Sequence, residues 1–166
     1  IDLNAIVKGW GVDKVAQFIH KRGFNRYIVE IGGEIAVSGK NKHNKNWEIG
    51  IPIPEYLQAE LYTTINLSNQ SVATSGSYNN YFNFEGVNYS HIIDPESGYP
   101  IKHDLVSATI VTQSCAFADA IATTVMVMGF NEGLNWVQTL PDVECLLIGR
   151  SEVGNYTTGK SDGFNY

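Results

Sequence analysis

The chain has 166 residues, 43% hydrophobic and 17% charged, and its 17 acidic against 11 basic residues give a net charge of −6. This predicts one domain with a sizeable core and argues against nucleic acid as a partner, because phosphate binding needs a basic stripe. No apolar stretch reaches the roughly 18 residues of a membrane span, no signal peptide is recognisable, and Cys115 and Cys145 are expected to be buried thiols, with a disulfide as the alternative.

A helix is predicted over residues 8–23, because apolar side chains recur at helical spacing and Gly23 suits its end. Asp2 precedes this helix, and Lys8 falls in its expected first turn. A lysine there opposes the helix dipole, and a bound phosphate would offset that penalty. Taken alone, a surface lysine is the simpler interpretation, and the segment is not a P-loop.

Strands are predicted over residues 26–31 and 34–39, joined by Gly32-Gly33 into a hairpin. The hairpin turn explains the two glycines fully, so a nucleotide-binding glycine loop is not supported. Residues 47–53 alternate like a strand, and their prolines favour a sheet edge. Residues 61–74 are rich in β-branched and aromatic types and form the next strand-rich segment.

The stretch SHIIDPESGYP (90–100) lies between predicted strands at 87–93 and 105–112. Asp94-Pro95 and Gly98 favour a turn, so His91 is placed near the end of a strand, just before a rigid loop. Catalytic groups often occupy such positions, although plain hairpins share the pattern.

A helix over residues 114–128 is predicted from its apolar periodicity, with Ser114 as its cap, and a shorter helix follows at 131–140 with Asn131 as its cap. Residues 143–149 read as a last buried strand. The polar segment 151–166 is expected to be loose or marginally paired. Because most connections are too short for helical crossovers, the fold class is α+β with a mostly antiparallel sheet.

Asp119 and Thr123 are four residues apart and share one face of the helix at 114–128. Their neighbours are small or apolar, and a buried carboxylate needs a partner. One interpretation is a hard divalent ion held by the carboxylate and the hydroxyl, with water and phosphate completing the shell. The alternative is that Asp119 pairs with Lys8 and Thr123 bonds back to its own helix.

The four histidines differ in their surroundings. His20 ends a predicted helix, where a cation is favourable, and His43 and His103 lie in polar loops. His91 alone is both near a turn and flanked by apolar strand residues. A single histidine of this kind is more often structural than catalytic, and no spacing in the chain indicates a Ser-His-Asp or Cys-His arrangement.

Five segments occur together in one order: DLNAIVKGWGVD, EIGGEI, ATSGSY, YSHIIDPESGYP and CAFADAIATT. With them the chain resembles the ApbE family, the FAD:protein FMN transferases, from Ile1 to about Gly149. The resemblance implies an enzyme that binds FAD and Mg²⁺ and transfers FMN to a threonine hydroxyl of an acceptor protein, with release of AMP. It implies acceptors among envelope redox-pump subunits. It also implies a periplasmic location or one at the outer face of the cell membrane, often as a lipoprotein.

By this resemblance Asp119, Thr123 and the backbone carbonyl of Ala5 match the magnesium ligands of the family. Asp2 and Lys8 match positions that contact FAD. Independently of the resemblance, attack on a pyrophosphate needs negative charge neutralised on the phosphate oxygens, which a metal ion and a lysine can supply.

The resemblance also makes His91 the group that acts on the incoming hydroxyl, and it places His91, Ile93 and Asp94 in one FAD-contacting segment. Asp94 either orients His91 or acts as the base itself. Ser97 stands where the family often has threonine, and Asn4 where it often has a smaller residue, but neither change alters an expected ligand.

Because the chain begins at Ile1, without Met and directly before the first of these segments, we expect residues 1–150 to be the C-terminal portion of an ApbE-like domain, followed by the tail at 151–166. Other walls of the flavin site would then come from an upstream portion. Two other functions stay open: an Mg²⁺-dependent FAD pyrophosphatase giving FMN and AMP, and a non-catalytic flavin-binding fragment.

Overall fold

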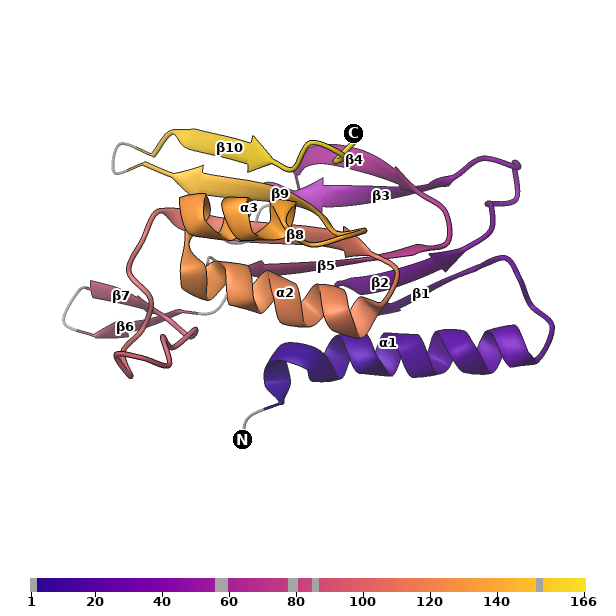
Figure 1. Ribbon diagram of the computed structural model, residues 1–166, viewed down its shortest axis with the longest axis horizontal. Helices are drawn as coiled ribbons and strands as arrows, with labels where there is room; N and C mark the ends of the chain where they lie inside the picture. Colours follow the sequence, from indigo (N-terminus) through magenta and orange to yellow (C-terminus); the bar gives the residue numbers. More distant parts are fainter. Residues whose placement is uncertain (1–2, 56–59, 78–80, 85–86, 152–153) are drawn as a thin grey trace.

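The antiparallel pairing expected from the short connections dominates the computed structural model, which describes the chain except for residues 1–2, 56–59, 78–80, 85–86 and 152–153 (Figure 1). The main sheet has the strand order β1-β2-β5-β8-β9-β10, and each neighbouring pair is antiparallel. Its strands are β1 (Tyr27–Ile31), β2 (Glu34–Ser38), β5 (Gln70–Gly76), β8 (Leu105–Thr112), β9 (Glu144–Arg150) and β10 (Tyr156–Lys160). The predicted α+β class is confirmed.

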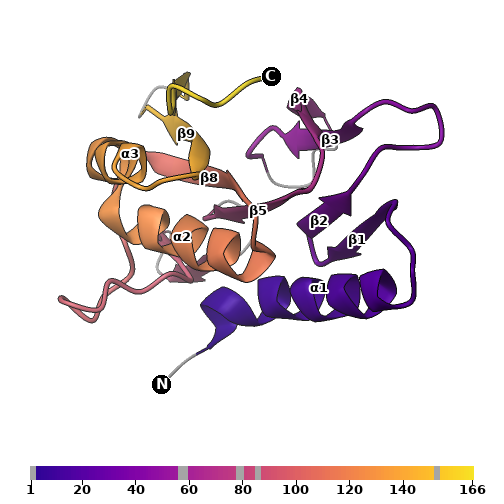
Figure 2. The ribbon, with the colours of Figure 1, turned by 45° about the vertical axis from the view of Figure 1, so that its right-hand side comes forward.

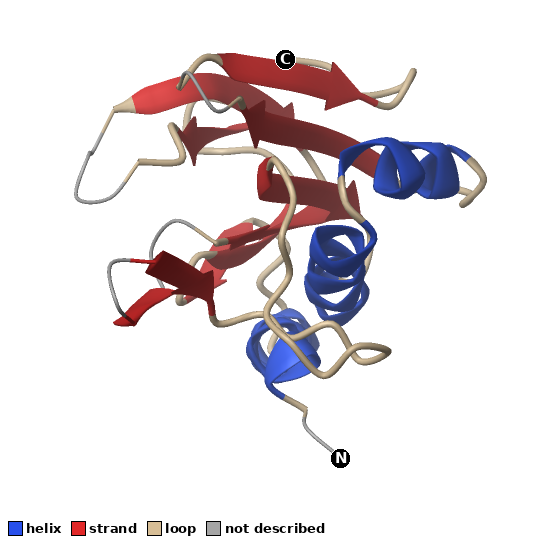
Figure 3. Cartoon of the chain, turned by 90° about the vertical axis from the view of Figure 1, so that its left-hand side faces the viewer, coloured by secondary structure: helices blue, strands red, loops and turns tan. Residues whose placement is uncertain are grey.

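The helices lie along one face of this sheet, as Figure 3 shows: α1 (Asn4–Lys21), α2 (Cys115–Met128) and α3 (Phe130–Gln138). Helix α2 packs on β5 and β8, α3 packs on β9, and α1 packs on β1, β2 and α2. None of the helices in the described part of the chain is both long and apolar enough to cross a membrane.

The hairpin of β3 (Trp47–Pro52) and β4 (Leu61–Leu67) covers the opposite face of the sheet. Neighbouring residues of the central strands therefore point into different cores: Ile110 faces the helices and Val111 faces the hairpin. A strand covered on both faces reads as a continuous apolar run, which explains the composition of β8 and β9.

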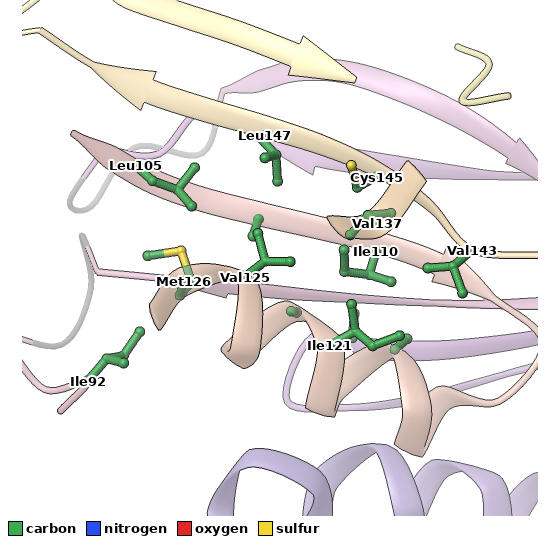
Figure 4. Close-up of a cluster of buried hydrophobic side chains, with 14 residues drawn as sticks. Ile92, Leu105, Ile110, Ile121, Val125, Met126, Val137, Val143, Cys145 and Leu147 are labelled. Carbon is green, nitrogen blue, oxygen red and sulfur yellow. The ribbon is translucent and has the colours of Figure 1, made fainter. Parts of the chain in front are cut away.

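The larger core lies between α2, α3 and the sheet (Figure 4). The side chains of Val125 and Met126 on α2 meet those of Leu105 and Leu147 on the strands. This packing fixes α2 rigidly on the sheet, and with it every functional side chain that α2 carries.

Helix α1 begins at Asn4, four residues earlier than predicted, so the expected place of Lys8 in the first turn is wrong. The dipole argument for a phosphate at Lys8 therefore fails. Gly9 explains how close this helix lies to α2: a Cβ built at Gly9 would stand only 2.3 Å from the carbonyl oxygen of Cys115. The first half of α1 is thus pressed against the start of α2.

The hairpin at Gly32-Gly33 is confirmed, with both glycines at positive φ and β1 paired with β2 in register. The strand-rich segment 61–74 is not one strand. It contains β4 and β5, which belong to different sheets, and the break falls at Asn69, which has a φ of 55°. The amide of Gly39 donates to the Asn69 side chain at 2.8 Å, so a long-range contact fixes this turn.

The strand predicted over 87–93 is shorter, because β7 (Val87–Ser90) ends before His91. It pairs with β6 (Tyr81–Phe84), a strand that the sequence did not predict. Beyond it the chain bends away, with Ile92 buried in the core and Ile93 in a single antiparallel bridge to Pro100.

Three features of the C-terminal region differ from or refine the predictions. Helix α2 begins after Ser114, whose hydroxyl accepts from the amide of Phe117 as expected, but α3 begins after Gly129 and not at Asn131. The tail is more ordered than expected, since β10 pairs with β9 and Phe164 is buried. Cys115 and Cys145 are free and buried, and burial raises the pKa of their thiols to about 12 and about 11.

Candidate active site

A cleft of about 630 Å³ opens between the start of α1, the end of β5, the loop after β7 and one face of α2. Six of the residues predicted from the sequence meet there: Ala5, Lys8, His91, Ile93, Asp119 and Thr123. They come from segments up to more than a hundred residues apart in the chain. Asp2 lies outside the described residues.

The carboxylate of Asp119 is buried under α1, with only 3% of the residue exposed. The backbone amide of Gly9 donates to its Oδ2 at 2.9 Å. Burial nonetheless raises the pKa of Asp119, with the Gly9 amide and the nearby Lys8 acting in the opposite direction. A carboxylate in this state favours a positive ligand, because a cation would offset the cost of burying its charge.

Thr123 lies one turn further along the same face of α2. Its hydroxyl is 3.2 Å from the Ser75 hydroxyl at the end of β5. Its neighbour Thr124, not Thr123, bonds back to the helix, donating to the carbonyl of Ala120. The alternative in which Thr123 bonds back to its own helix is therefore wrong, and Thr123 lines the cleft.

The carbonyl of Ala5 is the third oxygen that the resemblance assigns to a metal ion. In a regular helix the amide of Gly9 donates to the carbonyl four residues earlier, which is that of Ala5. Here the same amide donates to Asp119, and this bond competes with the helical one. Ala5 also lines the cleft, so the donor set is a carbonyl, a carboxylate and a hydroxyl.

These three oxygens fit a hard cation such as Mg²⁺, which takes one or two carboxylates and completes its shell with water and phosphate. Within the described ranges, no three His, Cys, Asp or Glu side chains gather into a metal site. A soft metal ion that requires nitrogen or sulfur ligands is therefore a poor fit to this cleft.

Lys8 is paired with a residue that the sequence did not single out. Its Nζ lies 2.6 Å from Oε1 of Glu34, which replaces the expected alternative of a pair with Asp119. Glu34 is the first residue of β2 and is 1% exposed. The sequence did contain a signal for Glu34: it lies on the same face of the strand as Ala36. A charged residue at such an inward position requires a partner, so a buried ion pair could have been predicted.

His91 is held beside the cleft by its neighbour. Ile92 is buried in the core, its amide donates to the Ser90 hydroxyl at 3.1 Å, and its carbonyl accepts from the amide of Ile101 at 3.0 Å. Because side chains alternate along an extended segment, burying Ile92 turns His91 and Ile93 outward, and both line the cleft. Ile92 also lines the cleft, although it is buried whereas Ile93 is exposed.

Asp94 belongs to the turn and does not line the cleft. Its Oδ1 accepts from the amide of Glu96 at 3.0 Å, and its carbonyl accepts from the amide of Gly98 at 2.8 Å. Hydrogen bonds from Ser97 and Glu96 lower the pKa of Asp94. This geometry favours His91 over Asp94 as the group that faces a ligand.

Comparison with known families agrees with the site geometry: the model of the ApbE family matches residues 1–147. The chain belongs to the ApbE family. Among curated relatives it is 43% identical over 154 residues to a FAD:protein FMN transferase of Vibrio cholerae, covering 93% of this chain and 46% of that one. It is 38% identical over 162 residues to the protein of that name in Haemophilus influenzae, covering 97% of this chain and 46% of the relative.

Solved structures agree with the sequence comparison. The flavin transferase ApbE from Vibrio cholerae superimposes with a TM-score of 0.86 at 39% identity, covering 99% of this chain and 51% of that one. The apo form of the flavinyl transferase ApbE from Pseudomonas stutzeri gives a TM-score of 0.84 at 33% identity, with 99% and 50% covered. The chain therefore spans about half the length of the relatives it matches.

Proposed function

We propose that this chain supplies the metal-binding and phosphate-binding half of a flavin transferase site. At that site FMN moves from FAD to a threonine hydroxyl of an acceptor protein, and AMP is released. The observation that carries the proposal is the meeting of oxygen donors, a lysine and a histidine in one cleft, within a chain of the ApbE family. The names of the relatives support flavin transfer to protein.

Lys8 would contact the pyrophosphate of FAD. Its side chain is 45% exposed although its ammonium contacts the buried Glu34, so the charged end lies between the protein interior and the cleft. An ammonium in this position attracts phosphate oxygens and helps to neutralise charge that develops on them.

Asp119, Thr123 and the carbonyl of Ala5 would hold Mg²⁺, which when bound neutralises charge on the phosphate oxygens and helps AMP to leave. The chain's own contribution is rigidity. Asp119 and Thr123 project from a helix packed on the sheet, and the amide of Gly9 fixes the carboxylate orientation. Ligands placed in this way keep the oxygen donors aligned before substrate arrives.

His91 would take the proton of the threonine hydroxyl. The hydroxyl oxygen then bonds to the FMN phosphorus, the bond from that phosphorus to the bridging oxygen breaks, and AMP carries away the electron pair. His91 is exposed and lines the cleft, so an acceptor segment can reach it from solvent. General base catalysis of this kind contributes typically about 10²–10⁴-fold.

Two features of the cellular setting follow from the same proposal. We infer that the acceptors are subunits of envelope redox pumps, and that the chain works as part of a lipoprotein in the periplasm or at the outer face of the cell membrane. Detection of flavin-labelled acceptor in an envelope fraction, and its loss on deletion of the gene, would test both inferences.

The direct test is a titration of the chain with FAD, with and without Mg²⁺, followed by an assay of AMP release with a threonine-containing acceptor. We expect Mg²⁺-dependent binding and one AMP released for each flavin bound to the acceptor. AMP without labelled acceptor would favour the FAD pyrophosphatase, in which water takes the place of threonine. Binding unaffected by Mg²⁺ and without AMP would favour the non-catalytic flavin binder, and no binding at all would overturn the proposal for this chain.

A further inference from the structure

Glu34 is a buried carboxylate that forms an ion pair with Lys8. Its side chain is 2% exposed, and Oε1 lies 2.6 Å from Nζ of Lys8. Within the part of the chain that the structure describes, Oε2 has no hydrogen-bond partner. Burial raises the pKa of Glu34, and Lys8 opposes that rise. The ion pair with Lys8 therefore offsets part of the desolvation cost of burying this carboxylate.

Glu34 is fixed by the pairing of its strand, whereas the ammonium of Lys8 is carried on a long side chain. Glu34 opens β2 directly after the Gly32-Gly33 turn and pairs with Ile31 in the hairpin register. Lys8 has a long flexible side chain whose stem passes the turn: a Cβ built at Gly32 would lie 3.4 Å from its Cδ. A charged end on such a stem loses rotamer freedom when a fixed partner holds it.

We propose that Glu34 is a positioning residue that holds the ammonium of Lys8 at the cleft, and that binding of phosphate-bearing flavin depends on this contact. The inference rests on the proposed phosphate role of Lys8. Glu34 itself does not line the cleft, so it acts through Lys8 and not on the ligand. Asp119 lies close enough to raise the pKa of Glu34, and Lys8 acts to lower the pKa of both carboxylates.

The first experiment tests the positioning without any flavin. Trace acetylation of the lysines with acetic anhydride, read by peptide mass spectrometry, compares Lys8 with Lys14, an exposed lysine of the same helix. In the wild-type chain Lys8 should react at least about threefold more slowly than Lys14, because its ammonium must leave Glu34 first. In Glu34→Gln the difference in acetylation rate between Lys8 and Lys14 should shrink. In the control Glu30→Gln, which changes an exposed glutamate of the same hairpin, the difference should remain. Equal reactivity of Lys8 in the wild type and Glu34→Gln would overturn the proposal.

The second experiment measures Kd for FAD and for riboflavin, which has no phosphate. Glu34→Gln should weaken FAD about tenfold, as expected for loss of a charge-assisted contact, and riboflavin by less than about twofold. Glu34→Asp keeps the charge and should recover part of the loss. A merely structural role would weaken both ligands alike.

A double-mutant cycle decides whether Glu34 acts through Lys8. In a Lys8→Ala background, Glu34→Gln should change the FAD Kd by less than about twofold, because the residue it positions is gone. An undiminished effect in that background would overturn the inference. If Lys8→Ala weakens FAD and riboflavin equally, the proposed phosphate role of Lys8 fails, while the acetylation experiment still decides whether Glu34 positions it.

Discussion

Two cavities lie along helix α1, and residue types alone do not tell them apart. The cleft near its start, of about 630 Å³, contains Lys8, Asp119 and His91. A groove near its end, of about 540 Å³, is lined by Asp13, His20 and Lys21, together with residues of β2 and of the turn before α2. Figure 2 shows α1 extending from beneath α2 at its start to beneath β1 and β2 in its second half. Each cavity thus has an acid, a histidine and a lysine.

The difference lies in how each carboxylate is satisfied. Asp13 accepts from the Ser114 hydroxyl at 2.8 Å and from the amides of Cys115 and Ala116 at 3.0 and 3.1 Å. These amides belong to the start of α2, so Asp13 is a structural anchor that completes the helix terminus. Asp119 is more deeply buried, and burial raises its pKa. A buried charge that the fold leaves incompletely compensated is a better marker of a ligand site than cavity volume.

The largest expected effect is on the rate of FMN transfer, and it should distinguish His91 in the cleft from His20 in the groove. His91→Ala should slow FMN transfer by about 10²-fold or more, because the proton acceptor is lost, with a smaller change in FAD affinity. His20→Ala is the matched control and should leave the transfer rate within about twofold. Equal losses of transfer and FAD affinity in His91→Ala would make it a binding residue.

Gly9→Ala should destabilise the fold by about 3 kcal/mol, because the added methyl would meet backbone atoms of α2 that cannot move aside. Gly11→Ala is the control, since the nearest atom there is 3.4 Å away on a flexible isoleucine side chain. Denaturant unfolding followed by circular dichroism measures both. A Gly9→Ala chain as stable as the control would show that α1 and α2 can separate without cost.

The two aspartates should respond in opposite ways. Asp13→Ala should lower the free energy of unfolding by about 1–2 kcal/mol, because it leaves donors at the start of α2 unpaired. Asp119→Asn should leave the metal-free stability unchanged or raise it by about 1 kcal/mol, because it removes a buried charge. Thermal melts with and without Mg²⁺ should show a metal-dependent rise in Tm for Asp13→Ala that Asp119→Asn lacks. A metal response retained in Asp119→Asn would remove Asp119 from the ligand set.

The smallest expected effect is on pH dependence. Burial raises the pKa of both Asp119 and Glu34 above their ordinary values of 3.8 and 4.5. Between those values and the higher folded-state values the folded chain holds more protons than the unfolded one, so the free energy of unfolding falls as the pH rises. In metal-free buffer this fall should be shallower for Asp119→Asn. An identical slope in urea titrations across this range would show that Asp119 contributes nothing to it.

The sequence by itself determined the elements whose signals are local. The helix at 114–128 was predicted from its periodicity and its cap, and the hairpin at Gly32-Gly33 from two residues that tolerate positive φ. The spacing of Asp119 and Thr123 on one helix face needed only the helical repeat. Resemblance then supplied the family, which the family model confirmed.

Only the tertiary structure decided which groups face one another. The contact of Lys8 with Glu34 spans 26 residues, and that of Gly9 with Asp119 spans 110, so no local pattern reveals either. The same holds for the early start of α1 and for β10, whose order depends on pairing with β9. Local periodicity specifies the elements, but burial and charge compensation arise only where separate elements pack together, and these determine the cleft.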